Sequence, residues 1–336
     1  MIAMKEEKKT IPLSVGGKRT ILLLDGNNVV WRGYHHLQNI VNSRGQNVGL
    51  ELGFFNILLR LVRTYQTADI KLVWDGEMIW KKILDPTYKK KVFGSKEEED
   101  ETLGVYVRIA KLREVCRSIC DTFYHRNLEA DEVAGILVAG CKAYNQPVML
   151  FSSDDDWMQL VDHLVRVIKP TKYGDEVYDI DRLVEEKGLH PNHYPWWKAL
   201  GGDEGDGIRG VPRMRRDYIK EAIRGVNATF YDDWNRLLRY FEEHYPSWFP
   251  KILELEERLL LNFKLVNLRD LRLPCTGSLA KGNVEVVKDF CRQLELPSLV
   301  ERREWDLFEP TRDIPGFQLK FFSESEKVSS EVSKIK

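Results

Sequence analysis

Three aspartates each follow a short apolar run. Asp25 ends the run ILLLD, Asp75 ends KLVWD, and Asp154 follows VMLF and two serines. Continuous apolar runs of this length are typical of strands in a parallel sheet that is buried on both faces. In open α/β sheets ligands bind at the carboxyl ends of the strands, so we expect these three carboxylates to meet although they are far apart in the sequence.

Further acids accompany these three aspartates. They occur in LEADEVAG, SSDDDW and GGDEGDGIRG and comprise Glu129, Asp131, Glu132, Asp156, Asp203 and Asp206. Several carboxylates in one crevice repel one another and need cations to remain ionised. A set of oxygen ligands without neighbouring Cys or His favours Mg²⁺ or Mn²⁺ over zinc. Two such ions about 3.5–4 Å apart would activate a water and stabilise a leaving oxygen, so the pattern predicts phosphodiester hydrolysis.

Each acid also has an ordinary structural explanation. An aspartate after a strand is commonly a helix N-cap, and acids in a first helical turn complement the helix dipole. At any single position we favour that explanation. The recurrence of acids at several predicted strand ends is what favours a shared site.

The elements that must position these acids alternate along the chain. Residues 20–24, 70–74, 147–151 and 164–168 have strand character, and residues 50–66, 106–123 and 130–145 have helical periodicity. Strand signals fade from about residue 179, where helices take over. This order predicts an α/β protein with a parallel sheet, followed by a helical part.

Composition fits a soluble protein. Of 336 residues, 43% are hydrophobic and 31% charged, and 51 Lys+Arg against 52 Asp+Glu give a net charge of −1. That balance argues mildly against a nucleic-acid binder, but a carboxylate-rich site would conceal basic patches in the total. No apolar run reaches membrane-spanning length and the N-terminus lacks a signal-like segment, so we expect a cytoplasmic protein. The five cysteines read as core thiols of a reducing compartment.

Five motifs occur together in a recognisable order: LLLDGNNVVWRGYHH, VWDGE, LEADEVAG, SSDDDWMQL and GGDEGDGIRGV. Over about residues 20–225 the chain resembles the flap endonuclease/5′→3′ exonuclease family, which includes phage enzymes and the N-terminal nuclease domain of bacterial DNA polymerase I. The resemblance implies a PIN-like, Rossmann-like mostly parallel sheet with flanking helices, a helical arch, and a helix-hairpin (helix–three-turn–helix) part that binds DNA. We expect an N-terminal tail at 1–18, a catalytic domain at 19–180 with the arch at about 80–125, a helical region at 181–310 and a C-terminal tail at 311–336.

The resemblance also implies the members of the catalytic site. Nine acids would bind two Mg²⁺ ions, which Mn²⁺ could replace: Asp25, Asp75, Glu129, Asp131, Glu132, Asp154, Asp156, Asp203 and Asp206. Glu132 stands where the family usually has Asp. Catalysis is expected of Asp25, Asp75, Glu129, Asp131 and Asp154, together with Lys89. Because all nine positions carry a carboxylate, the resemblance favours an active enzyme.

Basic residues would bind the nucleic acid. In KKILDPTYKKK, Tyr88 and Lys89 match the family pair at the foot of the arch, where Lys89 would neutralise the scissile phosphate and Tyr88 could stack on a base. Val92 stands where relatives often have Arg, so that phosphate contact is either missing or supplied by Lys90 or Lys91. Arg32 would contact the substrate end. Beyond Asp206 the family has a glycine-rich, duplex-gripping turn that often holds a monovalent cation, near Gly210 here. Arginines occupy two of its glycine positions, so side-chain contacts with phosphate are expected of Arg209, Arg213, Arg215 and Arg216.

A short peptide near the C-terminus stands apart from these motifs. Gln318, Leu319, Phe321 and Phe322 resemble the segment by which bacterial replication proteins bind a sliding clamp. Exposed Leu and Phe side chains in a polar tail are unfavourable unless they bind something. Packing of this segment on the protein's own core is an equally open alternative.

The sequence therefore predicts a monomeric, stand-alone 5′ nuclease of replication or repair, from a bacterium or a phage-infected host. It would cut 5′ flaps and remove RNA primers from branched or primer-bearing DNA and RNA–DNA hybrids, with a clamp or a single-strand-binding protein as candidate partners. A PIN-type ribonuclease and a catalytically silent branched-DNA-binding protein are the alternatives. Asp203, Asp206 and the arginines after them favour the nuclease over the ribonuclease, and the complete acid set argues against the silent protein.

Overall fold

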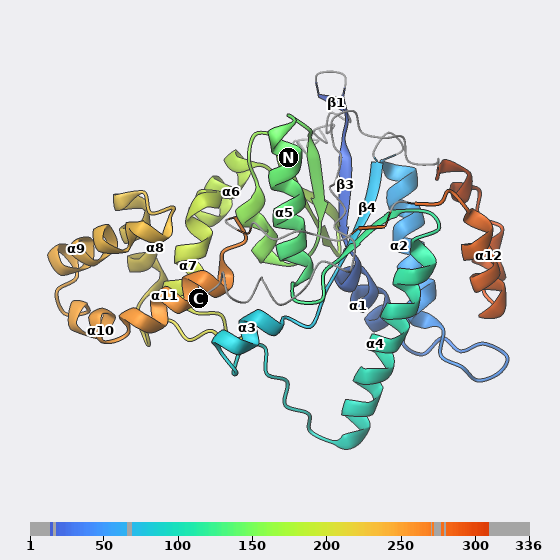
Figure 1. Ribbon diagram of the computed structural model, residues 1–336, viewed down its shortest axis with the longest axis horizontal. Helices are drawn as coiled ribbons and strands as arrows, with labels where there is room; N and C mark the ends of the chain where they lie inside the picture. The colour runs from blue at the N-terminus through green and yellow to red at the C-terminus, as the bar shows by residue number, and fades with distance from the viewer. Residues whose placement is uncertain are drawn as a thin grey trace, which may run out of the picture.

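A central β-sheet organises the chain. The computed structural model describes residues 14–15, 18–65, 69–269, 271, 277–278 and 280–308. The strands of the sheet are β3 (Ile21–Asp25), β4 (Asp69–Trp74), β5 (Asp121–Tyr124), β6 (Val148–Phe151), β7 (Val165–Thr171), β8 (Gly174–Tyr178) and β9 (Gly277–Ser278). They lie in the order β8-β7-β6-β3-β4-β5-β9, parallel from β7 to β5 and antiparallel at both edges (Figure 1). The expected mostly parallel sheet is confirmed.

Helices flank this sheet and dominate the chain after β8. They are α1 (Gly26–Leu37), α2 (Gly49–Thr64), α3 (Ile79–Leu84), α4 (Lys96–Cys116), α5 (Ala130–Ala143), α6 (Ile180–Lys187), α7 (Tyr194–Gly201), α8 (Arg216–Val226), α9 (Trp234–His244), α10 (Phe249–Glu254), α11 (Glu256–Val266), α12 (Val284–Gln293) and α13 (Pro297–Val300). Short 3₁₀ helices are η1 (Asp155–Leu160), η2 (Pro191–His193), η3 (Tyr231–Asp233) and η4 (Arg303–Leu307). Helices α8 to α11 lie at one end of the molecule and α12 at the other (Figure 1).

Both faces of the sheet are buried. Side chains alternate along a strand, so Leu22 and Leu24 of β3 pack in one core with α1, α2, α4 and α12. Ile21 and Leu23 pack on the opposite face with α5 and α6. This two-sided burial explains why the strands read as uninterrupted apolar runs.

The helical part has an aromatic core of its own. Trp196 of α7 stacks on Trp234 of α9 with ring centroids 5.6 Å apart, and its ring lies 4.3 Å from that of Phe263 on α11. The indole N–H of Trp196 donates a hydrogen bond to the carbonyl of Phe230 at 2.9 Å. Helix α7 thus joins this core to the GGDEGD loop that follows it.

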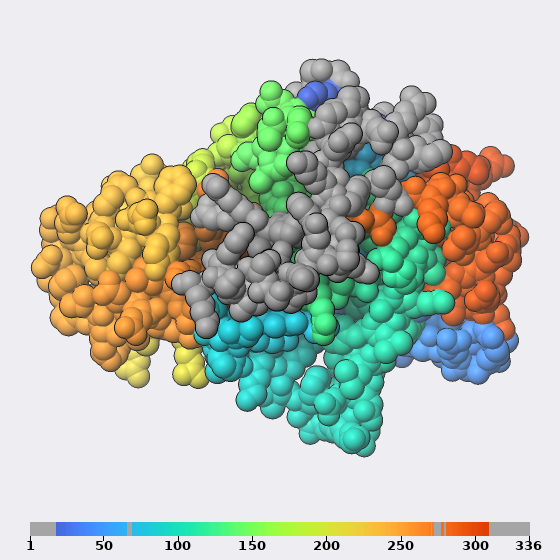
Figure 2. All heavy atoms as spheres, viewed as in Figure 1, coloured from blue at the N-terminus to red at the C-terminus, as the bar shows by residue number. Residues whose placement is uncertain are grey.

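The segment expected to form an arch contains α3, an extended connection and α4, which projects below the body (Figures 1 and 2). The prediction of a helix over 106–123 is wrong at both ends, because α4 begins at Lys96 and the chain has entered β5 by Asp121. Ser95 caps α4 by accepting a hydrogen bond from the amide of Glu98 at 3.2 Å. Glu97, Glu98 and Glu99 lie in the first turn, where negative charge complements the helix dipole. The acidic stretch is therefore a helix start.

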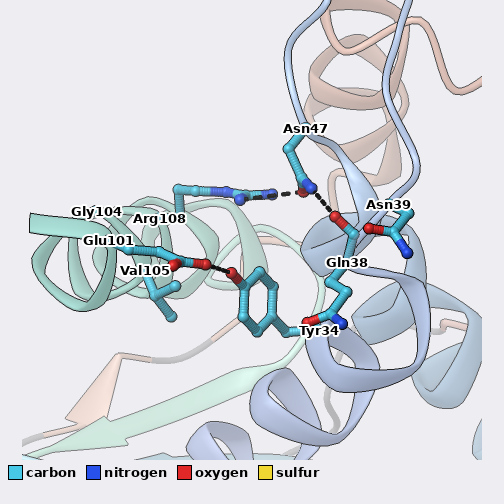
Figure 3. Close-up of a pocket in the computed structure, with 8 residues that line it drawn as sticks. All are labelled: Tyr34, Gln38, Asn39, Asn47, Glu101, Gly104, Val105 and Arg108. Carbon is cyan, nitrogen blue, oxygen red and sulfur yellow. Dashed lines mark hydrogen bonds between the residues drawn. The ribbon is translucent and has the colours of Figure 1, made fainter. Parts of the chain in front are cut away.

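Polar contacts join α4 to the body. Tyr34 of α1 donates a hydrogen bond to Glu101 (Figure 3). Arg108 forms an ion pair with Glu51 of α2. Arg108 also lies 3.5 Å from the side-chain oxygen of Asn47. Between α1 and α4 these side chains border an open hollow of about 340 Å³. None of the nine acids of the expected site lines it.

The ends of the described chain add two further features. Strands β1 (Ser14–Val15) and β2 (Lys18–Arg19) pair antiparallel, within and just beyond the segment expected to be a tail. Near the other end, Ser43 of the α1–α2 loop donates its backbone N–H to Glu295, just after α12, at 2.7 Å. Among the described residues, no helix is both long and apolar enough to cross a membrane.

Helices α1 and α2 cross where two glycines meet. A Cβ on Gly33 would lie 2.8 Å from the carbonyl carbon of Gly53, a distance that real Cβ atoms do not show. We expect Gly33→Ala to lower the free energy of unfolding by about 1–3 kcal/mol, measured by urea titration, because backbone must move to admit the methyl group. Gly104→Ala is the matched control, since nothing lies within 4 Å of a Cβ there. On the exposed helix α4 it should stabilise by about 0.5–1 kcal/mol; equal shifts in both variants would contradict the close crossing.

Candidate active site

The three strand-end aspartates lie at one edge of the sheet and also cap structure. Asp25 accepts hydrogen bonds from the amide of Asn28 and the hydroxyl of Ser152, both at 2.9 Å. Asp75 accepts from the first amide of α5, that of Ala130, at 2.8 Å. Asp154 caps η1 through the amide of Asp156 at 2.9 Å. The same three side chains therefore cap local structure and also lie where a shared site was expected.

The start of α5 contributes the next group of acids. Glu129 is the N-cap residue, and its own amide donates to Glu132 Oε2 at 2.8 Å. The amide of Glu132 lies 2.6 Å from Asp131 Oδ1. Glu132 is completely buried. Its side chain reaches back to close the first turn of the helix, a reach for which glutamate is the usual residue at this position of a capping box.

Three lysines stand among these acids. The ammonium of Lys81, which is 1% exposed, contacts Glu129 and lies 3.4 Å from Glu132. Lys89 Nζ is 2.5 Å from Glu129 and 3.3 Å from Asp206. The ammonium of Lys198 contacts Asp156 and lies 2.7 Å from Asp203. The lysines therefore partly neutralise a cluster that repulsion would otherwise drive apart.

The pKa values reflect this balance of burial and charge. Burial, reinforced by the nearby charge of Asp75, raises the pKa of Asp25 to about 8. Burial alone would raise the pKa of Glu129, but its ion pairs with Lys81 and Lys89 lower it to about 2. Burial and the charge of Glu129 hold the pKa of Asp131 well above its usual range. The charge of Asp154 contributes to the raised pKa of Asp25, so strands β3, β4 and β6 bring their acids within interaction range.

Two groups of these acids could hold a metal ion. In one, Glu129, Asp131 and Glu132 offer oxygens within 4.8 Å of one another; in the other, Asp156, Asp203 and Asp206 do the same. All donors are carboxylate oxygens, which suits hard divalent cations such as Mg²⁺, Mn²⁺ or Ca²⁺. The residues present therefore fit a divalent-metal site. Lys198 lies inside the second group and would have to move for an ion to enter it.

Lys89 is held at this site by its backbone as well as its side chain. Its N–H donates to the carbonyl of Asp206 at 3.0 Å, and its φ of +45° is left-handed. The expectation that Tyr88 stacks on a base is wrong for this conformation, because the ring is 3% exposed. The Tyr88 hydroxyl donates to Glu129 at 2.7 Å, and the ring lies beneath the ammonium of Lys89. Tyr88 therefore contacts two members of the site, Glu129 and Lys89, from a buried position.

The other expected nucleic-acid contacts fall at two places. Arg32 points toward β7, with guanidinium nitrogens 3.4 and 3.5 Å from the carbonyls of Pro170 and Thr171. Lys90 is exposed, whereas exposed Lys91 donates to the hydroxyl of Tyr106 on α4 at 2.7 Å. These residues border the arch and the carboxyl edge of the sheet.

The turn between α7 and α8 carries the arginine cluster. Arg213 has a φ of +63°, so an arginine adopts the left-handed conformation, which glycine adopts more readily. Arg209, Arg213 and Arg215 are exposed. Arg216 is also exposed, and it donates a hydrogen bond to the carbonyl of Gly202 at 3.1 Å and lies over the ring of Trp197. Gln318, Leu319, Phe321 and Phe322 lie outside the described residues.

Sequence reasoning missed two members of the site, Lys81 and Lys198. Lys198 is the lone charge in the apolar stretch WWKALGG, and Lys81 lies in WKKIL. A single charge in an apolar stretch is a signal that could have pointed to Lys198, whereas Lys81 is followed by Lys82 and has no such signal. Each is less than a tenth exposed and contacts at least one buried carboxylate, Glu129 for Lys81 and Asp156 for Lys198.

Comparisons with known proteins agree with this geometry. The family model of the 5′-3′ exonuclease N-terminal resolvase-like domain matches residues 20–188, half of the chain. DNA polymerase I of Pseudomonas aeruginosa is 28% identical over 211 residues, covering 62% of this chain but only 22% of the polymerase. The 5′-3′ exonuclease of Aquifex aeolicus is 24% identical over 294 residues, covering 84% of this chain and 94% of that protein.

Solved structures share the fold. The 5′-exonuclease of bacteriophage T5 with bound divalent metal ions (zinc) superposes with a TM-score of 0.60 at 19% identity, covering 84% of this chain and all of that chain. The same phage protein, described as a flap endonuclease in a complex with DNA and metal ions, gives a TM-score of 0.58. At this level of identity the likeness establishes the fold.

The raised pKa of Asp25 predicts how the metal-free protein depends on pH. The folded state binds this proton more tightly than the unfolded chain, whose aspartate titrates near 3.8, so stability is lost as the pH rises through about 8. The substitution Asp25→Asn removes the charge that repels Asp75. In EDTA we therefore expect this variant to have a higher melting temperature than wild type near pH 8, with the difference shrinking toward about pH 5. A lower melting temperature for the variant at high pH would contradict this account.

Proposed function

Because the chain belongs to the 5′-3′ exonuclease family, we propose that it is a structure-specific 5′ nuclease that removes 5′ flaps and 5′-terminal primer segments. The observation that supports the proposal is the convergence of acidic side chains at one sheet edge, where two groups of three carboxylates could each hold a metal ion and the ammonium of Lys89 lies beside them. In the proposed reaction, water attacks a phosphodiester and leaves a 5′-phosphate and a 3′-hydroxyl. Mg²⁺ is the proposed ion, with Mn²⁺ able to replace it.

The donor set supports a two-metal arrangement. Glu129 and Asp131, together with the neighbouring Asp25, Asp75 and Asp154, would hold one ion. Asp156, Asp203 and Asp206 would hold the other. When bound, the two ions would supply a water of lowered pKa and a positive charge near the leaving oxygen. Glu132 is better suited to a supporting role, because one oxygen closes the α5 capping box and the other faces Lys81.

Lys89 is suited to act on the substrate. Its side chain is 28% exposed, in contrast to the buried ammonium of Lys81, so a phosphate could reach it. A fixed ammonium beside a scissile phosphate would stabilise the negative charge that grows in the transition state. The left-handed backbone and the hydrogen bond to Asp206 hold this group in place before substrate arrives.

The surroundings of the site are suited to a branched substrate. Helix α4 and the connection before it project on one side, and the exposed Arg209, Arg213 and Arg215 lie in the loop after α7. Arginines of this kind bind phosphates without reading sequence, which fits recognition of duplex shape. Binding of a 5′ single strand near the arch and of duplex near the arginines would select a junction between the two. RNA–DNA hybrids and a clamp remain proposed partners.

Cleavage assays test the proposal directly. We expect Mg²⁺-dependent cutting of labelled 5′-flap DNA that EDTA abolishes. Asp25→Asn and Asp154→Asn should each slow it by at least about 100-fold, because each removes a charge from the metal site. Asp232→Asn, which changes an exposed carboxylate in the helical part, is the control and should cut at the wild-type rate.

The same assay separates the alternatives. Preferential cutting of free single-stranded RNA would favour a PIN-type ribonuclease. Tight flap binding without any metal-dependent cutting would favour a silent branched-DNA-binding protein. Either result would overturn the proposed function.

A further inference from the structure

The foot of the arch, residues 85–90, packs against helix α11 of the helical part. Its first residue, Asp85, ends α3 and is 5% exposed. One carboxylate oxygen accepts hydrogen bonds from the amide and the hydroxyl of Thr87, at 2.9 and 2.6 Å, which closes the turn. The other oxygen lies 2.6 Å from a guanidinium nitrogen of Arg258 on α11. A single buried carboxylate thus joins two segments that are far apart in the sequence.

Helix α11 presents a second face to this turn. Phe263 packs into the core of the helical part. Arg258, Leu261 and Leu265 recur at i, i+3 and i+7, which places them together on one side of the helix. Leu261 and Leu265 pack in the small cluster that contains Tyr88. The face of α11 that binds Asp85 therefore also packs against Tyr88, the residue before Lys89.

The turn sets the position of Lys89. Left-handed φ values are rare for residues with a Cβ and persist where surrounding contacts hold them. For Lys89 those contacts are its hydrogen bond to the Asp206 carbonyl and the packing of its neighbour Tyr88. A Cβ on Gly207 would lie 2.8 Å from the carbonyl of Thr87, which shows how closely the turn lies against the loop carrying Asp206. Any shift of the turn would move the ammonium group relative to the acids.

We propose that the ion pair between the buried Asp85 carboxylate and the partly buried Arg258 positions Lys89 for the reaction by holding the foot of the arch against α11. The inference rests on the proposed nuclease function. Among the described contacts, neither Asp85 nor Arg258 touches any of the nine acids, so both are positioning residues. The pair also links the helical part, which carries the arginine cluster, to the group beside the metal site.

The pKa of Asp85 is consistent with an ion pair that is formed in the protein without substrate. Burial would raise the pKa of Asp85, but hydrogen bonds from Thr87 and from Arg258 hold it below its ordinary value. The carboxylate is therefore charged at neutral pH. Removing the guanidinium leaves a buried charge without its ionic partner, so the turn must rearrange to reach water.

Single-turnover cleavage of the 5′-flap substrate, with enzyme in excess, tests the pair. The first-order rate constant under these conditions does not depend on the fraction of enzyme that is folded. We expect Arg258→Met and Asp85→Asn each to lower it about 10- to 100-fold, because small misplacements of a reacting group have effects of this size. The double variant should be no slower than either single variant, since both remove the same interaction. Arg258→Lys, which keeps the charge, should recover part of the loss.

Asp175→Asn is the matched control. Asp175 on β8 is also largely buried and forms a two-pronged ion pair, with Arg60 of α2 at 2.6 and 3.2 Å, but it packs against neither the arch foot nor α11. We expect its rate constant to equal that of wild type. Dissociation constants for the flap substrate should stay near the wild-type value in all variants. Wild-type rates in the Asp85 and Arg258 variants, or a loss confined to substrate affinity, would overturn the inference.

Hydrogen exchange gives a readout that needs no substrate. The Lys89 amide is protected by its bond to Asp206, so peptides spanning the arch foot should exchange faster in Arg258→Met and Asp85→Asn than in wild type or Asp175→Asn. Unchanged exchange in these peptides would also overturn the inference. Failure of the wild-type protein to cut flaps with Mg²⁺ would instead overturn the proposed function, and exchange would still decide whether the pair holds the turn.

Discussion

Mutual repulsion among carboxylates is the constraint on which the rest of the structure depends. Nine acids gather at the carboxyl edge of one sheet, and burial raises the pKa of several of them, Asp25 to about 8. The chain meets this repulsion with internal cations. Lys81 and Lys89 neutralise Glu129, and Lys198 lies between Asp156 and Asp203. The lysines therefore compensate enough negative charge for the site to fold, and the charge that remains uncompensated would attract divalent cations.

The three lysines come from two parts of the fold, the arch segment and the helical part. Lys81 lies on α3, Lys89 at the foot of the arch and Lys198 on α7. The sheet supplies the acids, whereas the arch and the helical part supply most of the compensating charge. The pair of Asp85 and Arg258 joins those two suppliers to each other. The arch and the helical part, which we expect to bind nucleic acid, therefore also supply the positive charges that neutralise part of the acidic cluster.

The sequence predicted the sheet edge well because strand burial and strand-end acids leave local signatures. The strands that carry Asp25, Asp75 and Asp154 were found close to their observed bounds. Strand β5 was missed because its four residues follow a long helix and continue its apolar pattern. The burial of Tyr88 and the roles of Lys81 and Lys198 were also missed, because they depend on partners far away in the chain. The residues next to a lysine in the sequence do not indicate which distant carboxylate will be its ion-pair partner.

We propose that the acids form two divalent-cation sites, one of which contains the Lys198 ammonium until an ion displaces it. Anomalous diffraction from crystals soaked in Mn²⁺ tests it most directly. We expect two manganese peaks, one beside Glu129 and Asp131 and one among Asp156, Asp203 and Asp206, with the Lys198 ammonium displaced from the second. Manganese peaks confined to other parts of the surface, with Lys198 still between Asp156 and Asp203, would contradict it.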